Sequence, residues 1–173
     1  MKKILVLLVV AALGAMVLTG RAASAPGEVG NTILSWKTMT AVKAPYLGAA
    51  PPDTFIPVDG VEGGRQDWAI ARAWGRLSTT GELSVHTRGL ILPGPPFNGT
   101  NPLPDFRALV KCRSTDASGN AVVVETFTTL YPASAGGDSD LETVITLPSP
   151  CIAPTVFVMH PAAPRWFATL GTD

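Results

Sequence analysis

Short apolar runs separated by glycine, proline and other turn residues dominate this chain after its first 25 residues. The runs are rich in Val, Ile, Thr, Phe and Trp, which favour strands, and none continues at helical spacing without an interrupting breaker. The 17 glycines and 16 prolines are spread along the chain instead of being confined to one linker. The pattern therefore predicts an all-β domain in which helix is scarce.

About eight strands are expected from this pattern, and eight short strands suit two packed sheets. We expect a single-domain β-sandwich with mainly antiparallel strands, and an open β-barrel is the alternative architecture. Two long irregular stretches, 44–66 and 93–105, are candidate loops for function. The expected strands are 33–42, 68–77, 83–92, 106–113, 122–130, 141–147, 155–160 and 165–170.

The segment 71–91 permits a residue-level prediction. If 79–81 is a three-residue hairpin loop, Gly81 supplies its left-handed residue, and residues whose numbers sum to 160 oppose each other. One face of the hairpin is then mostly apolar and suited to the core, with the pairs Leu77/Leu83, Gly75/Val85 and Ala73/Thr87. The other face is polar, with the pairs Arg76/Ser84, Trp74/His86 and Arg72/Arg88.

The first 25 residues have a different pattern. Two lysines precede an apolar run over 4–18, and the small residues 23–25 follow it, which is the order of a secretory signal peptide. The run is shorter than the ~20 residues of a membrane-spanning helix. We therefore expect a cleaved signal peptide over 1–25 and one secreted or periplasmic β domain over 26–173, without membrane insertion after cleavage.

The chain has two cysteines, Cys112 and Cys151. Alternation along 106–113 places Cys112 on the apolar face of its strand, with Phe106, Ala108 and Val110. An even cysteine count in an exported protein favours a disulfide. The bridge would close a loop of about 40 residues and stabilise the fold by roughly 4 kcal/mol in the chain-entropy model.

Charge and motifs exclude several classes of function. Three of the 13 basic residues lie in the N-terminal segment, so the rest of the chain has a net charge near −3, which argues against nucleic-acid binding. No P-loop or dinucleotide fingerprint is present, and neither histidine has an evident nucleophile and carboxylate. The sequence therefore predicts no cofactor and no catalytic residue.

Four residues on the polar face of the hairpin form a candidate binding patch: Arg72, Trp74, His86 and Arg88. Two arginines directly opposite each other repel, so the pair requires an acidic neighbour or an anionic ligand, and with the aromatic residues beside it the patch could bind a carboxylate, a phosphate or a sugar. In the alternative interpretation, arginine stems pack over the tryptophan and a loop carboxylate such as Asp67 or Glu82 neutralises them.

Asp138, Asp140 and Glu142 place carboxylates at alternate positions after two glycines, and calcium prefers oxygen ligands from such a loop. The spacing of an EF-hand is not met, because Thr143 and Ser149 stand where that loop would have its glycine and its last glutamate. The other interpretation is a solvated acidic turn, and no metal is expected there.

Four further segments of the chain form a recognisable set. They are Gly89-Leu90 after the hairpin, 99–107 with Cys112, 147–158 and Trp166-Phe167-Ala168. Together they resemble a group of short exported bacterial proteins of uncharacterised function. The resemblance covers most of the mature chain, and it implies a shared fold and disulfide without implying an activity. The hairpin alone is similar to the CHRD domain, a β module of extracellular proteins.

These observations favour a non-catalytic secreted or envelope module that binds a partner, a glycan or a small anion. A secreted hydrolase whose site assembles only in three dimensions is one alternative, and a structural envelope protein is another. A binding module should present a contiguous outward patch, and a hydrolase should present a concave pocket where a histidine meets a carboxylate.

Overall fold

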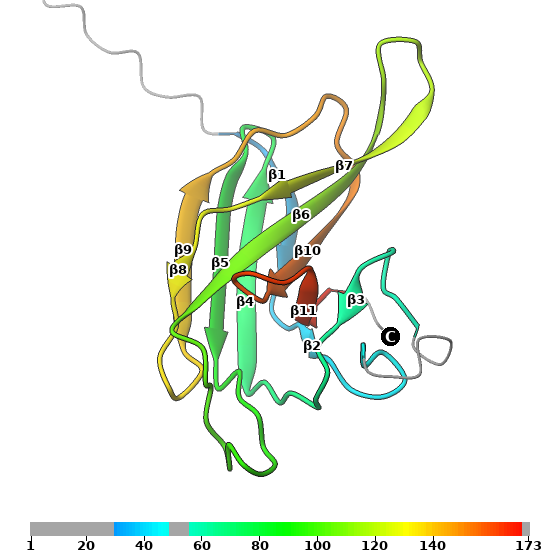
Figure 1. Ribbon diagram of the computed structural model, residues 1–173. Helices are drawn as coiled ribbons and strands as arrows, with labels where there is room; N and C mark the ends of the chain where they lie inside the picture. Colours follow the sequence, from blue (N-terminus) through cyan, green and yellow to red (C-terminus); the bar gives the residue numbers. More distant parts are fainter. Residues whose placement is uncertain (1–29, 49–55, 171–173) are drawn as a thin grey trace, which may run out of the picture.

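The computed structural model describes residues 30–48 and 56–170, in which two β-sheets pack face to face and no helix occurs (Figure 1). The sheets do not close into a barrel, so the sandwich is the correct one of the two expected architectures. No helix in these residues is long and apolar enough to cross a membrane. The expected signal peptide, 1–25, lies outside the described residues.

One sheet has four strands in the order β1-β4-β5-β9, and every neighbouring pair is antiparallel. Its strands are β1 (Thr32–Trp36), β4 (Arg72–Ser78), β5 (Glu82–Arg88) and β9 (Ser139–Val144).

The other sheet has seven strands, five of which follow the order β2-β11-β10-β6-β7. The short β3 pairs parallel with β11, and the short β8 pairs antiparallel with β6. The strands are β2 (Thr40–Ala41), β3 (Glu62–Gly63), β6 (Asp105–Thr115), β7 (Ala121–Phe127), β8 (Tyr131–Pro132), β10 (Ile152–Met159) and β11 (Arg165–Thr169).

All eight expected strands occur, with one division. The stretch 33–42 splits into β1 and β2, because the chain leaves the four-stranded sheet after Trp36 and enters the seven-stranded sheet at Thr40. The two strands that the pattern did not predict, β3 and β8, have two residues each, which is too short to produce a visible alternation.

The β4–β5 hairpin has the predicted register. Arg72 pairs with Arg88 and Leu77 with Leu83, and the four pairs between them also match. Gly81 has a φ of 82°, and a Cβ at this position would lie 1.9 Å from the carbonyl oxygen of Ile145, so two constraints require glycine here. The predicted core face is buried, with its side chains between the two sheets.

An aromatic cluster packs in the core. Trp68, just before β4, stacks on Phe167 of β11 with ring centroids 4.1 Å apart, and Phe106 of β6 meets both rings edge-on. Because β6 and β11 belong to the seven-stranded sheet and Trp68 leads into the four-stranded sheet, these rings join the two layers.

The face of β6 opposite to Cys112 carries Arg107, Leu109, Lys111 and Arg113, and it is more buried than its three basic residues suggest. Lys111 is only 7% exposed, and its Nζ donates to the carbonyl oxygen of Asp59 and pairs with Glu125. Trp166 of β11 is fully buried and donates from Nε1 to the carbonyl oxygen of Val61. The irregular stretch before β4 therefore covers part of this sheet and adds apolar contacts outside the main core.

The predicted disulfide is present between Cys112 and Cys151, with Cα atoms 5.0 Å apart. Cys112 lies on β6 and is buried, whereas Cys151 directly precedes β10 and is half-buried. The bond therefore ties the β9–β10 connection to the central part of the seven-stranded sheet.

Replacing both cysteines with alanine should lower the free energy of unfolding by about 4 kcal/mol, because the bridge spans 39 residues and restricts the unfolded chain. Urea unfolding monitored by tryptophan fluorescence would measure this change. The reduced wild-type protein should unfold at the same urea concentration as the double variant. An unchanged midpoint in the double variant would contradict the stabilising role of the bond.

Candidate functional site

The four residues of the predicted binding patch lie together on the outward face of the four-stranded sheet. The rings of Trp74 and His86 stack with centroids 5.0 Å apart and planes inclined by 17°. The guanidinium carbons of Arg72 and Arg88 lie 4.9 Å and 5.1 Å from the centroid of the Trp74 ring. The hairpin register produces this arrangement, because it places Trp74 opposite His86 and the two arginines opposite each other.

Asp140 of β9 supplies the negative charge that the paired arginines require. It pairs with His86 across the sheet and accepts a 2.7 Å hydrogen bond from Nδ1 of that histidine. Nη2 of Arg88 donates to both of its carboxylate oxygens, at 3.0 and 3.1 Å. The hydrogen bond from His86, followed by Arg88, holds the pKa of Asp140 below its usual value.

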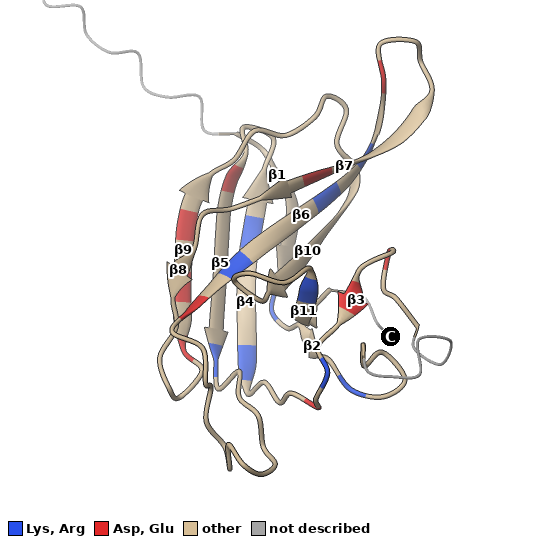
Figure 2. Ribbon diagram, in the orientation of Figure 1, with Lys and Arg blue, Asp and Glu red and all other residues tan. Residues whose placement is uncertain are grey.

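His86 and Arg88 are therefore satisfied by residues of the sheet, whereas Arg72 has no ion pair in the described chain and lies over the Trp74 ring. Nη1 of Arg88 donates to the carbonyl oxygens of Thr87 and Ser139. Three cationic or aromatic side chains already contact the Trp74 ring, so it offers little free surface for stacking a sugar. In Figure 2, acidic positions on β9 lie near the basic position at the end of the neighbouring strand β5, and β4 on the far side of β5 carries further basic positions.

The calcium candidates do not gather around a common point. Asp138 accepts a 3.0 Å hydrogen bond from the backbone N–H of Gly89, and Asp140 is occupied by His86 and Arg88. Within 30–48 and 56–170, no group of three or more His, Cys, Asp or Glu side chains could hold a metal ion. Asp138 and Asp140 therefore stabilise contacts with β5 and the residue after it, which the spacing of the carboxylates along the sequence did not indicate.

A concave site occurs elsewhere, between the segment before β4, the 93–104 loop and the β10–β11 turn. This aromatic cavity, defined by Trp68, Phe97 and Phe167, has a volume of about 440 Å³. Trp68 and Phe167 form the stacked pair of the core, and Phe97 comes from the loop. Leu92 and Leu103 complete the apolar wall.

Buried hydrogen bonds hold the 93–104 loop against the body of the domain. Asn101 is 5% exposed, and its Nδ2 donates to the carbonyl oxygens of Leu103 and Ser134. Its Oδ1 accepts from the N–H of Leu103. Leu92 and Thr100 form an isolated bridge that closes the base of the loop. The wall that Phe97 and Leu103 contribute is therefore supported by the fold.

Cationic and neutral donor groups line the polar side of the aromatic cavity. Arg165 is mostly buried and pairs with Glu62 at 3.2 Å, whereas Arg65 is exposed at the rim. His160 and Gln66 add further polar groups. None of the described residues that line this cavity carries a carboxylate. The electrostatic potential in the cavity should therefore favour an anion.

The protonation state of His160 follows from its contacts. Its Nδ1 accepts hydrogen bonds from the backbone N–H groups of Ala162 and Ala163, at 3.0 and 2.9 Å. An acceptor at Nδ1 places the proton of the neutral ring on Nε2. Burial, followed by the charges of Arg107 and Arg165, lowers the pKa of His160 and favours this neutral form. The cavity thus has a neutral N–H donor beside its arginines.

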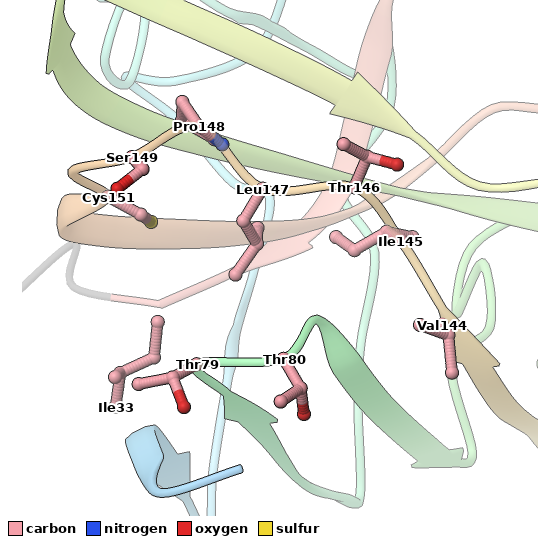
Figure 3. A pocket seen from close by; sticks show the side chains of 10 residues that line it. All are labelled: Ile33, Thr79, Thr80, Val144, Ile145, Thr146, Leu147, Pro148, Ser149 and Cys151. Atoms are coloured by element: carbon pink, nitrogen blue, oxygen red, sulfur yellow. The ribbon is translucent and has the colours of Figure 1, made fainter. Parts of the chain in front are cut away.

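A second cavity, of about 510 Å³, lies beside the disulfide (Figure 3). Ile33 and the hairpin-loop residues Thr79 and Thr80 lie across it from Leu147 in Figure 3. Its lining in the described chain has hydroxyl and apolar groups but no charged side chain. It therefore lacks a group that would orient a charged ligand.

The two histidines do not form a hydrolase site. His86 meets Asp140, but on an open sheet face. His160 lines a cavity, but its Nδ1 is occupied by backbone N–H groups and it has no carboxylate partner among the described residues. In the part of the chain that the structure describes, no serine, threonine or cysteine hydrogen-bonds to either ring.

Sequence reasoning found the sheet-face patch but missed the cavity and the role of Asp140. Asp140 lies 54 residues from His86, and only the pairing of β5 with β9 brings them together. The cavity residues come from three separate segments. The available signals were the two irregular stretches 44–66 and 93–105, which the sequence had suggested as candidate functional loops and which supply Arg65 and Phe97 to the cavity.

Asp140→Asn should destabilise the protein slightly at neutral pH, by less than about 1 kcal/mol, because the ion pair is exposed and screened. The pKa of Asp140 is lowered in the folded state, so its contribution is complete above the unfolded value near 3.8 and is lost as the pH falls through the folded value. Wild type and variant should therefore become equally stable in acid. Urea unfolding at a series of pH values measures this convergence.

Glu142→Gln is the matched control, because Glu142 lies on the same strand opposite Ser84 and makes no ion pair with the described residues. It should follow the wild type at every pH. A constant difference between wild type and Asp140→Asn, persisting into acid, would show that the charge of Asp140 is not responsible.

Comparison of the chain with protein-family models, curated proteins and solved structures finds no match. The resemblance to short exported bacterial proteins and to the CHRD domain therefore stays a prediction. The functional argument rests on the geometry of the sheet-face patch and the aromatic cavity.

Proposed function

We propose that this domain is a non-catalytic binding module that holds a small organic anion in the aromatic cavity. The ligand has an aromatic or apolar body and a carboxylate or similar acidic group. The observation that carries the proposal is the combination of the Trp68, Phe97 and Phe167 walls with Arg65, Arg165 and a neutral His160.

The size and chemistry of the cavity suit such a ligand. Its volume of about 440 Å³ lies within the range of small-molecule sites, which are mostly apolar with a few well-placed polar groups. Trp68 and Phe167 are only 3% and 4% exposed, so Phe97 and Leu103 offer more of the accessible apolar wall. Burial of an aromatic ring against this wall would favour binding. An arginine can form two parallel hydrogen bonds to a carboxylate, which would orient the ligand.

Arg65 is the better candidate for direct contact with the acidic group. Arg165 already pairs with Glu62, and its side chain is 20% exposed. Arg65 is exposed at the rim of the same cavity, so its guanidinium is free to approach a ligand from the solvent side. Arg165 then contributes to the positive potential and holds β3 against β11.

A secreted or periplasmic location belongs to the same proposal. Disulfides form and persist in oxidising compartments, and the Cys112–Cys151 bond is compatible with one. The sheet-face patch is the weaker candidate for the ligand site, because Asp140 already neutralises Arg88 and occupies His86. We therefore assign that patch a structural role in joining β5 to β9.

Aromatic carboxylates such as benzoate and indole-3-acetate should raise the melting temperature of the protein, because a ligand that binds only the native state stabilises it. The corresponding neutral amides should bind more weakly, since they lose the charge-assisted hydrogen bond. Quenching or shift of tryptophan fluorescence gives the affinity, with Trp68 as the expected reporter.

Arg65→Ala should weaken carboxylate binding by about tenfold or more, the effect of losing one charge-assisted hydrogen bond, and should leave amide binding unchanged. Arg76→Ala is the matched control, because Arg76 is an exposed arginine on the four-stranded sheet and does not line the cavity. Equal affinity for acids and amides would contradict anion recognition. No binding of any aromatic compound would contradict the proposed function.

A further inference from the structure

The strand β7 has an unpaired edge. It pairs with β6 on one side, from Leu109 opposite Phe127 to Thr115 opposite Ala121, and the described chain places no strand on its other side. In Figure 1 the β6–β7 hairpin extends past the other strands, so its turn stands clear of the sandwich.

Two backbone hydrogen bonds determine which residues face the open edge. The N–H of Thr128 donates to the carbonyl oxygen of Ala108, and the N–H of Asp116 donates to that of Asn120. Backbone groups alternate in direction along an antiparallel strand, so the even-numbered residues of β7 bond to β6. The N–H and C=O groups of Ala121, Val123, Glu125 and Phe127 therefore point to the open edge.

This edge lacks the devices that normally prevent strands from pairing with another chain. Such edges usually carry a lysine, a proline or a bulge. The sequence of β7 is AVVVETF, and its register with β6 has no irregularity. Its one charged residue, Glu125, pairs with Lys111 at 2.9 Å. Val123 and Phe127 are large apolar residues that stay 54% and 41% exposed.

The other long edge strands differ in this respect. β9, at one edge of the four-stranded sheet, carries Asp140 and Glu142 on its outward face. β1, at the other edge, has an irregular register between Thr32 and Leu34. Among the described strands, β7 therefore combines regular geometry, apolar composition and free backbone groups.

We propose that two copies of this chain pair through β7, antiparallel and around a two-fold axis at Val124. Val123 of each copy lies opposite Glu125 of the other, and Ala121 lies opposite Phe127. The two seven-stranded sheets then form one continuous sheet across the dimer. A two-fold axis is the commonest symmetry of such pairs, because each copy uses the same surface.

The direction of the backbone N–H and C=O groups along β7 limits the registers in which two copies can pair. Residues that exchange both backbone hydrogen bonds must face each other, so the odd-numbered residues of one copy must oppose odd-numbered residues of the other. The proposed register overlaps all seven residues of β7. Sliding one strand by two residues in one direction would place Glu125 opposite its own counterpart, where like charges repel.

Charge also favours a second copy as the occupant of this edge. Val123 pairs with Arg113 on β6, and Arg113 is exposed and has no ion pair in the described chain. Glu125 of the second copy would lie opposite Val123 and within reach of this arginine. Each Glu125 would then lie between Lys111 of its own chain and Arg113 of the other.

The dimer is independent of the proposed ligand site. The aromatic cavity is lined from segments 64–68, 92–103 and 160–167, and none of its residues lies on β7. Ligand binding and dimer formation can therefore succeed or fail separately.

The first test is the mass of the protein in solution, measured by analytical ultracentrifugation over a wide concentration range. We expect a concentration-dependent equilibrium between monomer and dimer. Val123→Glu should weaken the dimer about five- to thirtyfold, because it places like charges opposite each other twice per dimer. Val123→Lys should weaken the dimer less than Val123→Glu does, since its ammonium group would face Glu125.

Val144→Glu is the matched control, because Val144 is 70% exposed and belongs to β9 of the four-stranded sheet, on the outward face that carries Asp140 and Glu142. It should dimerise like the wild type. A protein that stays monomeric at all concentrations would overturn the proposal. Equal loss of the dimer in Val123→Glu and Val123→Lys would overturn the register.

Cross-linking tests the register without relying on weakened variants. A mixture of the Val123→Cys and Glu125→Cys proteins should form an intermolecular disulfide on mild oxidation, because these residues would face each other. Each variant alone should cross-link much less, since identical positions are offset diagonally. Equal cross-linking in the mixture and in the single variants would overturn the proposed pairing.

Discussion

The stacking of Trp68 on Phe167, with Phe106 packed edge-on against both, is the contact on which the rest of this structure depends. It joins the segment leading into the four-stranded sheet to β6 and β11 of the seven-stranded sheet. The same two stacked rings form the wall of the aromatic cavity. The core that holds the layers together thus also shapes the candidate binding site, and a ligand there would contact residues that the fold already holds rigid.

The two charged regions of the domain differ in how fully their charges are compensated. On the sheet face, Asp140 accepts hydrogen bonds from both His86 and Arg88, so the favourable interactions are already made within the protein. Around the aromatic cavity, Arg165 has one partner and Arg65 is exposed beside an apolar wall. On the sheet face, Arg72 has no ion pair in the described chain, but it lies over Trp74 on an open surface. The arginines of the cavity lie beside a concave apolar wall, and this difference supports the choice of the cavity as the proposed site.

Local features of the chain were sufficient to predict much of the fold. The strand pattern predicted the sandwich, and a glycine at the third position of a three-residue loop predicted the whole hairpin register, because that turn fixes which residues oppose each other. The cysteine count, together with the expected signal peptide, predicted the disulfide. The division of 33–42 between two sheets was missed, because a strand that changes layer keeps the composition of a continuous strand.

The sequence by itself determined the class of fold, the hairpin, the disulfide and the assembly of Arg72, Trp74, His86 and Arg88, because each follows from alternation, from a short turn or from the cysteine count. Only the tertiary structure decided that Asp140 neutralises this patch and that Trp68, Phe97, Phe167 and His160 surround one cavity. These contacts join residues tens of positions apart, and their geometry depends on how the two sheets pack and where the loops are held. Neither periodicity nor composition along the chain carries that information.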